Sequence, residues 1–175
     1  SVFHGFGSSW IIPETGILLN NRLTGFSLDP NSPNVIAPGK RPAHTLNAFT
    51  AVNPDGTLHL VGGTPGANIQ VQSNLQLITN IVDLKMNVQE ATEAARWQHL
   101  SLPGQSSEEE LGNGVLEIEN RVSSAVLDEL RAKGHDVRPL AAWAHGSSVQ
   151  LMQVLPNGTF AFGSDPRCEG HASGI

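Results

Sequence analysis

Hydrophobic residues recur at helical spacing between residues 68 and 83 of the chain. Val71, Leu75, Ile78 and Val82 fall on one side of a helical wheel. This pattern predicts a helix over residues 68–83 whose apolar stripe is buried against the rest of the fold.

Two more helices are indicated by residues suited to their ends. Asn87 can accept hydrogen bonds from a first helical turn while Glu90 reaches back to the Asn87 backbone, which predicts a helix starting there. Residues 124–133 form another helical pattern, and Gly134 is suited to end it. The polar and acidic segment between these helices, residues 101–114, is expected to be a loop.

Two hairpins are predicted by short apolar runs on either side of a turn. Residues 49–52 and 58–61 enclose the turn sequence Asn-Pro-Asp-Gly, in which Pro and Gly match β-turn geometry. Residues 149–154 and 159–162 enclose a second turn that contains Pro-Asn-Gly. We expect an antiparallel strand pair at each place.

Other apolar segments predict further strands. Residues 115–118 have the pattern of a strand, and residues 11–12 and 17–19 are short apolar runs that suit buried strands. Hairpins mixed with helices favour an α+β layered fold. We see no repeat and no boundary, so residues 1–175 are predicted to form a single domain.

Composition argues against several classes of function. The net charge is −6 and the ten Lys and Arg residues are scattered, whereas nucleic-acid binding requires a basic patch. No apolar run is long enough to span a membrane. Cys168 is the only cysteine, which rules out an intrachain disulfide, and the histidines lack the HxxxH or HExxH spacing of a zinc site.

Gly66 and Ala67 are the first candidates for chemistry. They follow a predicted strand and open the helix expected over residues 68–83, so free backbone N–H groups and the helix dipole are available to a developing oxyanion. Gly66 also lacks the side chain that would prevent a close approach. The alternative interpretation is a tight strand-to-helix turn with no catalytic role.

Four segments in a fixed order carry a resemblance to a known family. They are Thr15-Gly16-Ile17-Leu18-Leu19-Asn20-Asn21, Ala37-Pro38-Gly39-Lys40-Arg41-Pro42, Gly62-Gly63-Thr64-Pro65-Gly66-Ala67 and Gly163-Ser164-Asp165-Pro166-Arg167. With them, nearly the whole chain resembles the small subunit of a γ-glutamyltranspeptidase-type N-terminal nucleophile hydrolase. The resemblance implies a four-layer αββα sandwich, of which this chain supplies about half, and a large subunit cut from the same precursor as its partner. It also implies self-cleavage and no need for a metal or an organic cofactor.

The same resemblance implies roles at the reaction centre. The family's nucleophile is a Thr at the start of the small subunit, and the alignment places it roughly twenty residues before Ser1, so this chain alone is expected to be inactive. Gly66 and Ala67 match the two glycines whose N–H groups form the oxyanion hole. Ser1 aligns with a hydroxyl residue near the nucleophile. Asp165-Pro166-Arg167, in contrast, is assigned to structure, as a rigid turn with an ion pair.

Four positions bear on the acyl group of the substrate. His44 and Thr45 match two family serines that hold the α-carboxylate. Arg22 stands where the family has a Gln and Gly25 where it has an Asp, two groups that help to hold the α-ammonium of the donor. Arg22 would repel an ammonium and is suited to a carboxylate. On the residues alone, two structural interpretations stay open: Arg22 as a surface or interface arginine paired with an acid, and His44 as a loop histidine bonded to the backbone.

The expected function is that of an amide hydrolase or acyltransferase for γ-glutamyl or related acidic amides. The segment between the Asn-Asn and Lys-Arg-Pro sequences is shorter than the family's lid, which favours an open site and hydrolysis over transfer. Two alternatives stay open. The chain could be a catalytically silent structural or binding domain, or Ser1 itself could be the N-terminal nucleophile.

Overall fold

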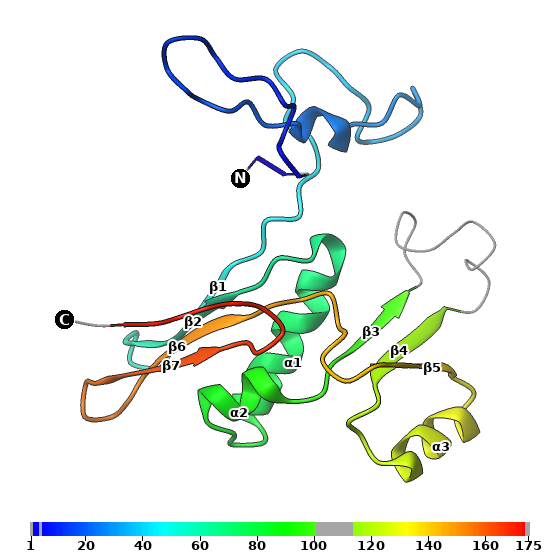
Figure 1. Cartoon of the computed structure of the whole chain (residues 1–175), viewed down its shortest axis with the longest axis vertical. Coiled ribbons are helices and arrows are strands. Elements are labelled where there is room, and N and C mark those ends of the chain that lie inside the picture. Colours follow the sequence, from blue (N-terminus) through cyan, green and yellow to red (C-terminus); the bar gives the residue numbers. More distant parts are fainter. Residues whose placement is uncertain (1, 4, 101–113, 174–175) are drawn as a thin grey trace. The chain divides into compact units, whose positions relative to one another are not determined.

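The computed structural model describes residues 2–3, 5–100 and 114–173 of the chain. It divides into two compact units, Ser1–Leu46 and Asn47–Ile175, and each unit is described by itself. Figure 1 shows the helices and strands of both units. The predicted acidic loop at residues 101–114 lies, but for its last residue, outside the described residues.

The Asn47–Ile175 unit contains two sheets within its described residues. Its elements in chain order are β1 (Phe49–Val52), β2 (Leu58–Gly63), the 3-10 turn η2 (Ala67–Ile69), α1 (Gln70–Val82), α2 (Val88–Glu93), β3 (Trp97–Leu100), β4 (Val115–Glu119), α3 (Ser124–Ala132), β5 (Asp136–Leu140), β6 (Gln150–Val154) and β7 (Phe160–Ser164). The four-stranded sheet has the order β1-β2-β6-β7 and is antiparallel throughout. The three-stranded sheet has the order β3-β4-β5, in which β4 and β5 are parallel and α3 connects them.

The main hydrophobic core lies between the four-stranded sheet and the helices α1 and α2, which cover one face of it (Figure 1). Its fully buried members are Leu60, Leu77, Ile81, Val88, Ala91, Val149 and Leu151. Gly163 of β7 allows α2 to come close, because a Cβ at this position would collide with the backbone carbonyl of Val88. The α+β interpretation is confirmed, as are both predicted hairpins.

Helix α1 confirms the predicted helix, but its predicted buried stripe is wrong. Val71 and Leu75 are 61% and 58% exposed, and Val82 is 41% exposed. The helix packs on the sheet through the neighbouring face, which carries Leu77 and Ile81. Periodicity identified the helix, but the choice of the buried face was made by tertiary packing.

Two glutamines of α1 bind the backbone of β3, which is an edge strand. Gln72 donates to the His99 carbonyl at 3.1 Å and accepts from the His99 N–H at 2.7 Å. Gln76 makes the same pair of bonds with Trp97, at 2.8 and 3.1 Å. These side chains take the place of a further strand, so α1 protects the edge of the second sheet.

Helices α2 and α3 begin where the sequence predicts. Asn87 and Glu90 form the complete capping box at the start of α2. Ser123 accepts a hydrogen bond from Val126 at the start of α3, and Gly134, with φ of 95°, follows its end. A smaller core lies under α3, formed by Leu116, Ile118 and Val137 with Trp97, Val122, Leu127 and Leu130 around it.

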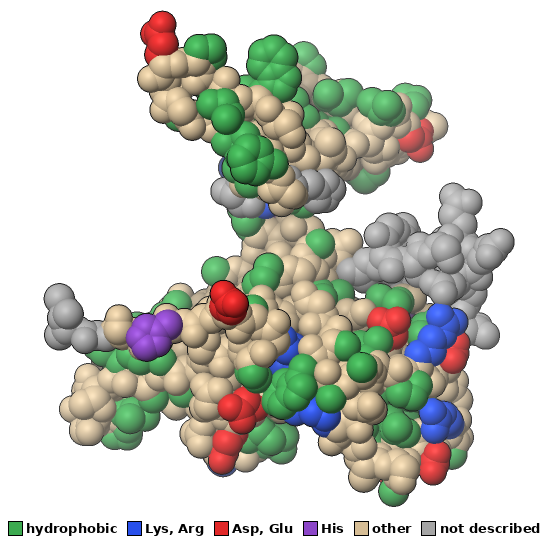
Figure 2. Space-filling view, viewed as in Figure 1, with side chains coloured by type: hydrophobic (Ala, Val, Ile, Leu, Met, Phe, Trp, Pro, Cys, Tyr) green, Lys and Arg blue, Asp and Glu red, His purple; other side chains and the backbone are tan. Residues whose placement is uncertain are grey.

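The Ser1–Leu46 unit is made of turns, and no described residue in it is buried. The predicted buried strands at residues 11–12 and 17–19 are wrong, since only an isolated bridge joins Ile11 to Leu18 and Ile17 is 56% exposed. The short 3-10 turn η1 (Arg22–Gly25) is the helical element described here. Figure 2 shows hydrophobic side chains on the surface of this unit. Its apolar runs therefore have no core within the unit to enter.

No described helix combines the length and the apolar character that a membrane span requires.

Candidate oxyanion turn and its surroundings

The turn between β2 and α1 has an unusual backbone. Gly66 has φ of 129° and Ala67 has φ of 49°, so two consecutive residues occupy conformations that L side chains rarely adopt. For a non-glycine residue such as Ala67, the left-handed conformation costs roughly 1–2 kcal/mol. Strain of this kind persists only where the surrounding structure enforces it, and it is concentrated at functional sites.

Both residues lie just before α1, and among the described residues their backbone N–H groups are free. The Gly66 carbonyl accepts from the Ile69 N–H at 3.0 Å, which closes the turn. No acceptor within the described ranges binds the N–H of Gly66 or of Ala67. A Cβ added at Gly66 would lie 2.7 Å from Cγ1 of Ile69, so this position has room for glycine alone. The turn can therefore offer two adjacent donors to an anion.

Thr64 connects this turn to the loop that precedes β6. Its hydroxyl donates to the Pro65 carbonyl at 2.7 Å and accepts from the Ser148 N–H at 2.9 Å. The carbonyl of Gly146, in the same loop, would lie 3.7 Å from a Cβ at Gly66. The sequence pattern assigned no role to Thr64.

A buried ion cluster of Arg96, Glu119, Asp165 and Arg167 lies where the two sheets meet. Arg96 contacts Asp165 at 2.5 Å, and their side chains are 2% and 0% exposed. Arg167 contacts Asp165 at 2.9 Å and binds Glu119 through two hydrogen bonds of 2.7 and 2.6 Å. Two guanidinium groups and two carboxylates balance one another, which is the condition under which charges can be buried.

The cluster is closed on its solvent side by Arg121 and Trp143. Arg121 binds Glu119 at 2.6 Å, and its guanidinium carbon lies 3.5 Å from the centroid of the Trp143 ring. The guanidinium carbon of Arg167 lies 5.1 Å from the same ring. Both are cation–π distances. The Trp143 indole therefore packs on the two guanidinium groups without displacing their hydrogen bonds to Glu119.

The buried ion cluster and its surroundings fix the protonation of Glu119 and of the neighbouring His145. Burial alone would raise the pKa of Glu119, but hydrogen bonds from Arg167, Arg121 and the His145 N–H outweigh it and hold this pKa at about 2. Burial lowers the pKa of His145 to about 4, and the positive charge of Arg96 acts in the same direction. His145 is therefore neutral, and Glu119 ionised, near neutral pH.

The predicted turn and ion pair at Asp165-Pro166-Arg167 are confirmed. Sequence reasoning missed Arg96 and Glu119, which complete the cluster, and His145, which binds Glu119 and Ser147 beside it. The position of Glu119 at the end of β4, directly after the apolar Ile118, was the available signal. Arg96 gives no local signal, because its side-chain partners Asp165 and Ser147 come from distant parts of the chain.

In the Ser1–Leu46 unit, Arg22 begins η1 and is half-buried. Its guanidinium carbon lies 4.3 Å from the centroid of the Phe3 ring, and its backbone N–H donates to the Asn20 side chain at 2.9 Å. The stacking holds the guanidinium plane in place.

The residues Arg22, Gly25, His44 and Thr45 belong to one neighbourhood of this unit. Asn34 donates to the Gly25 carbonyl and accepts from the Ala43 N–H at 3.0 Å, which brings η1 beside the chain that leads into His44 and Thr45. A Cβ at Gly25 would lie 2.7 Å from the Ala43 carbonyl oxygen. His44 is exposed and Thr45 half-buried.

The predicted site residues thus fall into two groups. Gly66 and Ala67 share one turn of the Asn47–Ile175 unit, whereas Arg22, His44 and Thr45 lie in the Ser1–Leu46 unit. Ser1 lies outside the described residues. Among the residues that the structure describes, no group of three His, Cys, Asp or Glu side chains is placed to hold a metal ion.

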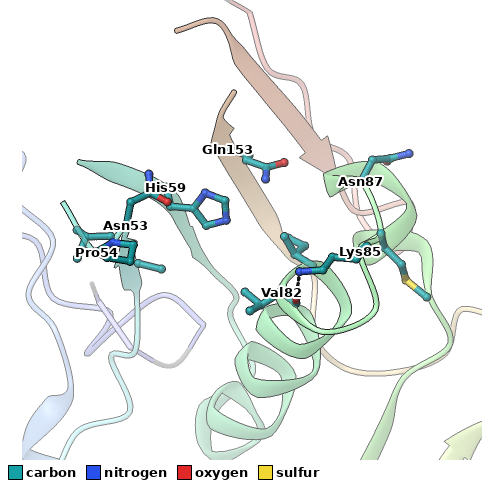
Figure 3. Close-up of a pocket in the computed structure, with 11 residues that line it drawn as sticks. Asn53, Pro54, His59, Val82, Lys85, Asn87 and Gln153 are labelled. Atoms are coloured by element: carbon teal, nitrogen blue, oxygen red, sulfur yellow. Dashed lines mark hydrogen bonds between the residues drawn. The ribbon is translucent and has the colours of Figure 1, made fainter. Parts of the chain in front are cut away.

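A cavity of about 540 Å³ lies at the opposite end of β2 and α1 from the Gly66 turn (Figure 3). His59 of β2 and Gln153 of β6 face it, and Lys85 follows the end of α1. The Lys85 ammonium donates to the Val82 carbonyl at 2.7 Å. This cavity is separate from the candidate oxyanion turn.

Comparison with known proteins gives one family over the whole chain. The model of the family Gamma-glutamyltranspeptidase matches residues 1–175. The oxamate amidohydrolase proenzyme of Klebsiella pneumoniae is 38% identical over 176 residues, covering 99% of this chain and 32% of the relative. The glutathione hydrolase proenzyme of Escherichia coli K12 is 36% identical over 172 residues, covering 93% of this chain and 27% of the relative.

Solved structures agree with this result. The cephalosporin acylase of Bacillus halodurans superposes with a TM-score of 0.79 at 30% identity, over 98% of this chain and 31% of that one. The γ-glutamyltranspeptidase of Pseudomonas nitroreducens, complexed with L-DON, gives 0.79 at 26% identity, over 100% and 90%. The chain spans about a third of the length of the curated relatives it matches. Its α+β fold is of the N-terminal nucleophile hydrolase type, and the chain belongs to the gamma-glutamyltranspeptidase family.

Proposed function

We propose that this chain supplies the oxyanion-binding turn of an amide hydrolase that acts on acidic acyl groups lacking an α-ammonium. The observation that carries the proposal is the Gly66–Ala67 backbone, which is held in a strained form with two adjacent N–H groups free. Donors of this kind stabilise the negative charge of a tetrahedral intermediate in acyl transfer.

The reaction needs a nucleophile, which we place N-terminal to Ser1, as the family's Thr. Its hydroxyl oxygen would attack the substrate amide carbon while its own α-amine accepts the proton. The amide carbonyl oxygen would gain negative charge facing Gly66 and Ala67. Collapse of the tetrahedral intermediate would break the C–N bond, the leaving amine would take the proton from the α-amine, and an acyl-enzyme would remain. Water would then release the acid, and we favour water over an amine acceptor because the lid segment is short. A large subunit from the same precursor completes the proposed enzyme, and both curated relatives above are named as proenzymes.

The acyl group is proposed from Arg22 and Gly25. The family's Asp would not fit at Gly25 in this backbone, because even a Cβ would lie 2.7 Å from the Ala43 carbonyl oxygen. A carboxylate at this position, which would balance a substrate ammonium, is therefore disfavoured by the packing as well as absent from the sequence. Arg22 adds a positive charge in the same neighbourhood. The relative named for oxamate supports this class, since oxamate carries a carboxylate and no α-ammonium.

The test compares a glutaryl anilide with its γ-glutamyl counterpart, which differ in the α-amino group. The full-length enzyme is expected to prefer the glutaryl donor in kcat/KM by about ten- to a hundredfold, since a charge-assisted hydrogen bond contributes roughly 1.5–3 kcal/mol. Arg22→Gln should reduce that preference. Arg41→Gln, which removes an exposed arginine of the same unit, is the matched control and should leave the preference unchanged.

A preference for the γ-glutamyl donor, or an unchanged ratio in Arg22→Gln, would defeat the substrate assignment alone. Absence of turnover with both donors and with oxamate would instead favour the alternative of a catalytically silent domain.

A further inference from the structure

We propose that Thr64 is a positioning residue that sets the direction of the Gly66 N–H, with the buried ion cluster as its anchor. This inference rests on the proposed function, because it concerns how the oxyanion turn is held in place. It assigns a role to a hydroxyl that itself touches neither the substrate nor the nucleophile.

The geometry of the peptide unit makes this control direct. The Pro65 carbonyl and the Gly66 N–H belong to one planar trans peptide, so they point in opposite directions. The Thr64 hydroxyl donates to the Pro65 carbonyl at 2.7 Å. Holding the carbonyl end of the plane therefore fixes the direction in which the Gly66 N–H points.

The second donor is held by a different bond. The Gly66 carbonyl and the Ala67 N–H form the next peptide plane, and its carbonyl end accepts from the Ile69 N–H at 3.0 Å. This bond lies within the turn and needs no side chain. Of the two donors, only that of Gly66 depends on a side-chain hydroxyl. A substitution at Thr64 should therefore affect the Gly66 N–H without affecting the Ala67 N–H.

The Thr64 hydroxyl has little freedom to turn away. It accepts from the Ser148 N–H at 2.9 Å, and this bond occupies a lone pair and leaves the proton for the Pro65 carbonyl. A hydroxyl bound on both sides has a defined direction, which a hydroxyl facing water lacks.

Ser148 is itself held on both sides by the ion cluster. Arg96 donates to the side chain of Ser147 at 2.9 Å and to its carbonyl at 3.2 Å. The N–H of Val149 donates to Asp165 at 2.8 Å. The backbone on either side of Ser148 is therefore attached to charged side chains that are almost fully buried, which makes the Ser148 N–H a firm support for Thr64.

The test is the KM and kcat of full-length Thr64→Val, Thr64→Ala and Thr64→Ser with the glutaryl anilide. Losing a whole oxyanion donor lowers kcat by about a hundred- to a thousandfold, and losing only its orientation is expected to lower kcat by about tenfold or more. KM should change little, because the donor acts on charge that develops in the transition state. Thr64→Ser keeps the hydroxyl and should restore kcat to within about threefold.

Thr57→Val is the matched control. The Thr57 hydroxyl also makes two hydrogen bonds, to Asn53 and Asp55, but in the turn between β1 and β2 at the far end of β2. It loses comparable bonds without touching the Gly66 peptide, so kcat should stay at the level of the unsubstituted enzyme. A loss of kcat in Thr57→Val equal to that in Thr64→Val would overturn the proposal.

Backbone order measured by NMR separates this proposal from the proposed function. Thr64→Val should lower the amide order parameter of Gly66 and leave those of β1 and the β1–β2 turn unchanged, whether or not a substrate is found. Unchanged kcat with an unchanged order parameter at Gly66 would overturn the positioning role while leaving the hydrolase intact. Unfolding of both Thr64→Val and Thr64→Ala would also overturn it, because the hydroxyl would then be a requirement of folding.

Discussion

The Gly66–Ala67 turn and the Arg22–Gly25 turn are held by different means. The first sits between a strand and a helix that share a packed core, and Thr64 ties it to the loop beside the buried ion cluster. The second lies in a unit without a buried described residue, where Asn34 and short-range hydrogen bonds keep the backbone together. One region is fixed by packing and buried charge, and the other by individual polar bonds.

This difference matches the two tasks proposed for them. Oxyanion stabilisation requires donors held within a fraction of an ångström, which rigid elements provide. Recognition of an acyl group can change with a few substitutions in loops, provided that the reaction centre stays in place. Changes in the first region should therefore act on kcat, and changes in the second on KM and selectivity.

The largest effect is expected from Gly66→Ala. The new Cβ would lie 2.7 Å from Cγ1 of Ile69, at a φ of 129° that alanine cannot adopt without strain. The turn must move, and kcat for the glutaryl anilide should fall by about a hundredfold or more. Steady-state kinetics of the full-length enzyme measure this.

Gly158→Ala separates the loss of a donor from the loss of stability. Gly158 has φ of 82° in the β6–β7 turn and nothing within 4 Å of an added Cβ. This variant carries similar backbone strain far from the Gly66 turn and should keep kcat. If Gly66→Ala retained the kcat of Gly158→Ala while folded, the oxyanion assignment would be wrong.

The buried ion cluster, which anchors the Gly66–Ala67 turn, should contribute less to the free energy of unfolding in acid. His145 has a pKa of about 4 in the folded chain, below the ordinary 6.5, so its stabilising contribution is complete above pH 6.5 and is lost as pH falls toward 4. Glu119 has a pKa of about 2 instead of 4.5, so its contribution is lost at lower pH, from 4.5 toward 2. Each group can give a slope of up to about 1.4 kcal/mol per pH unit in the free energy of unfolding.

Urea unfolding at a series of pH values tests this. The unsubstituted protein should lose stability between pH 6.5 and 4, and His145→Asn, which keeps an acceptor near Ser147, should flatten the curve in that window. His135→Asn changes an exposed histidine and serves as the control. Parallel curves for all three proteins would show that His145 does not couple to folding.

Local signals in the sequence predicted much of the fold. The capping box at Asn87, the two hairpin turns and the glycine after α3 all act over a few residues, and all are present. Strands β3 and β5 were missed because neither is joined to its partner by a recognisable hairpin turn. Two of the four residues of β3 are polar, and β5 contains Pro139, which an edge strand tolerates. The buried face of α1 was predicted wrongly because the helix carries apolar residues on two neighbouring faces. Periodicity alone does not determine which of them packs on the sheet.

The site residues that could be predicted are also those marked by a local sequence pattern. Gly66 and Ala67 could be singled out because a glycine between a strand and a helix is a local pattern. The ion pair of Asp165 and Arg167 was also within reach, being two residues apart. The link from Arg96 through Ser147 and Ser148 to Thr64 was not, because it joins loops that only the fold brings together.

The smallest change in the kinetic constants is expected from Gly25→Ala, which tests the Arg22–Gly25 turn. The new Cβ would meet the Ala43 carbonyl oxygen at 2.7 Å and push η1 away from the chain that leads to His44. Overpacking of this kind costs about 1–3 kcal/mol in a dense core and less in an open loop, so we expect KM for the glutaryl donor to rise by about three- to tenfold. The oxyanion turn is untouched, so kcat should stay within about twofold.

Gly39→Ala is the control for Gly25→Ala, because Gly39 lies in the same unit with φ of 71° and open space around an added Cβ. It strains the backbone more than Gly25→Ala does, yet it should leave KM unchanged. A fall in kcat at constant KM in Gly25→Ala, similar to that in Gly66→Ala, would mean that both regions serve the chemical step. The division between a rigid reaction centre and an adaptable acyl site would then have to be given up.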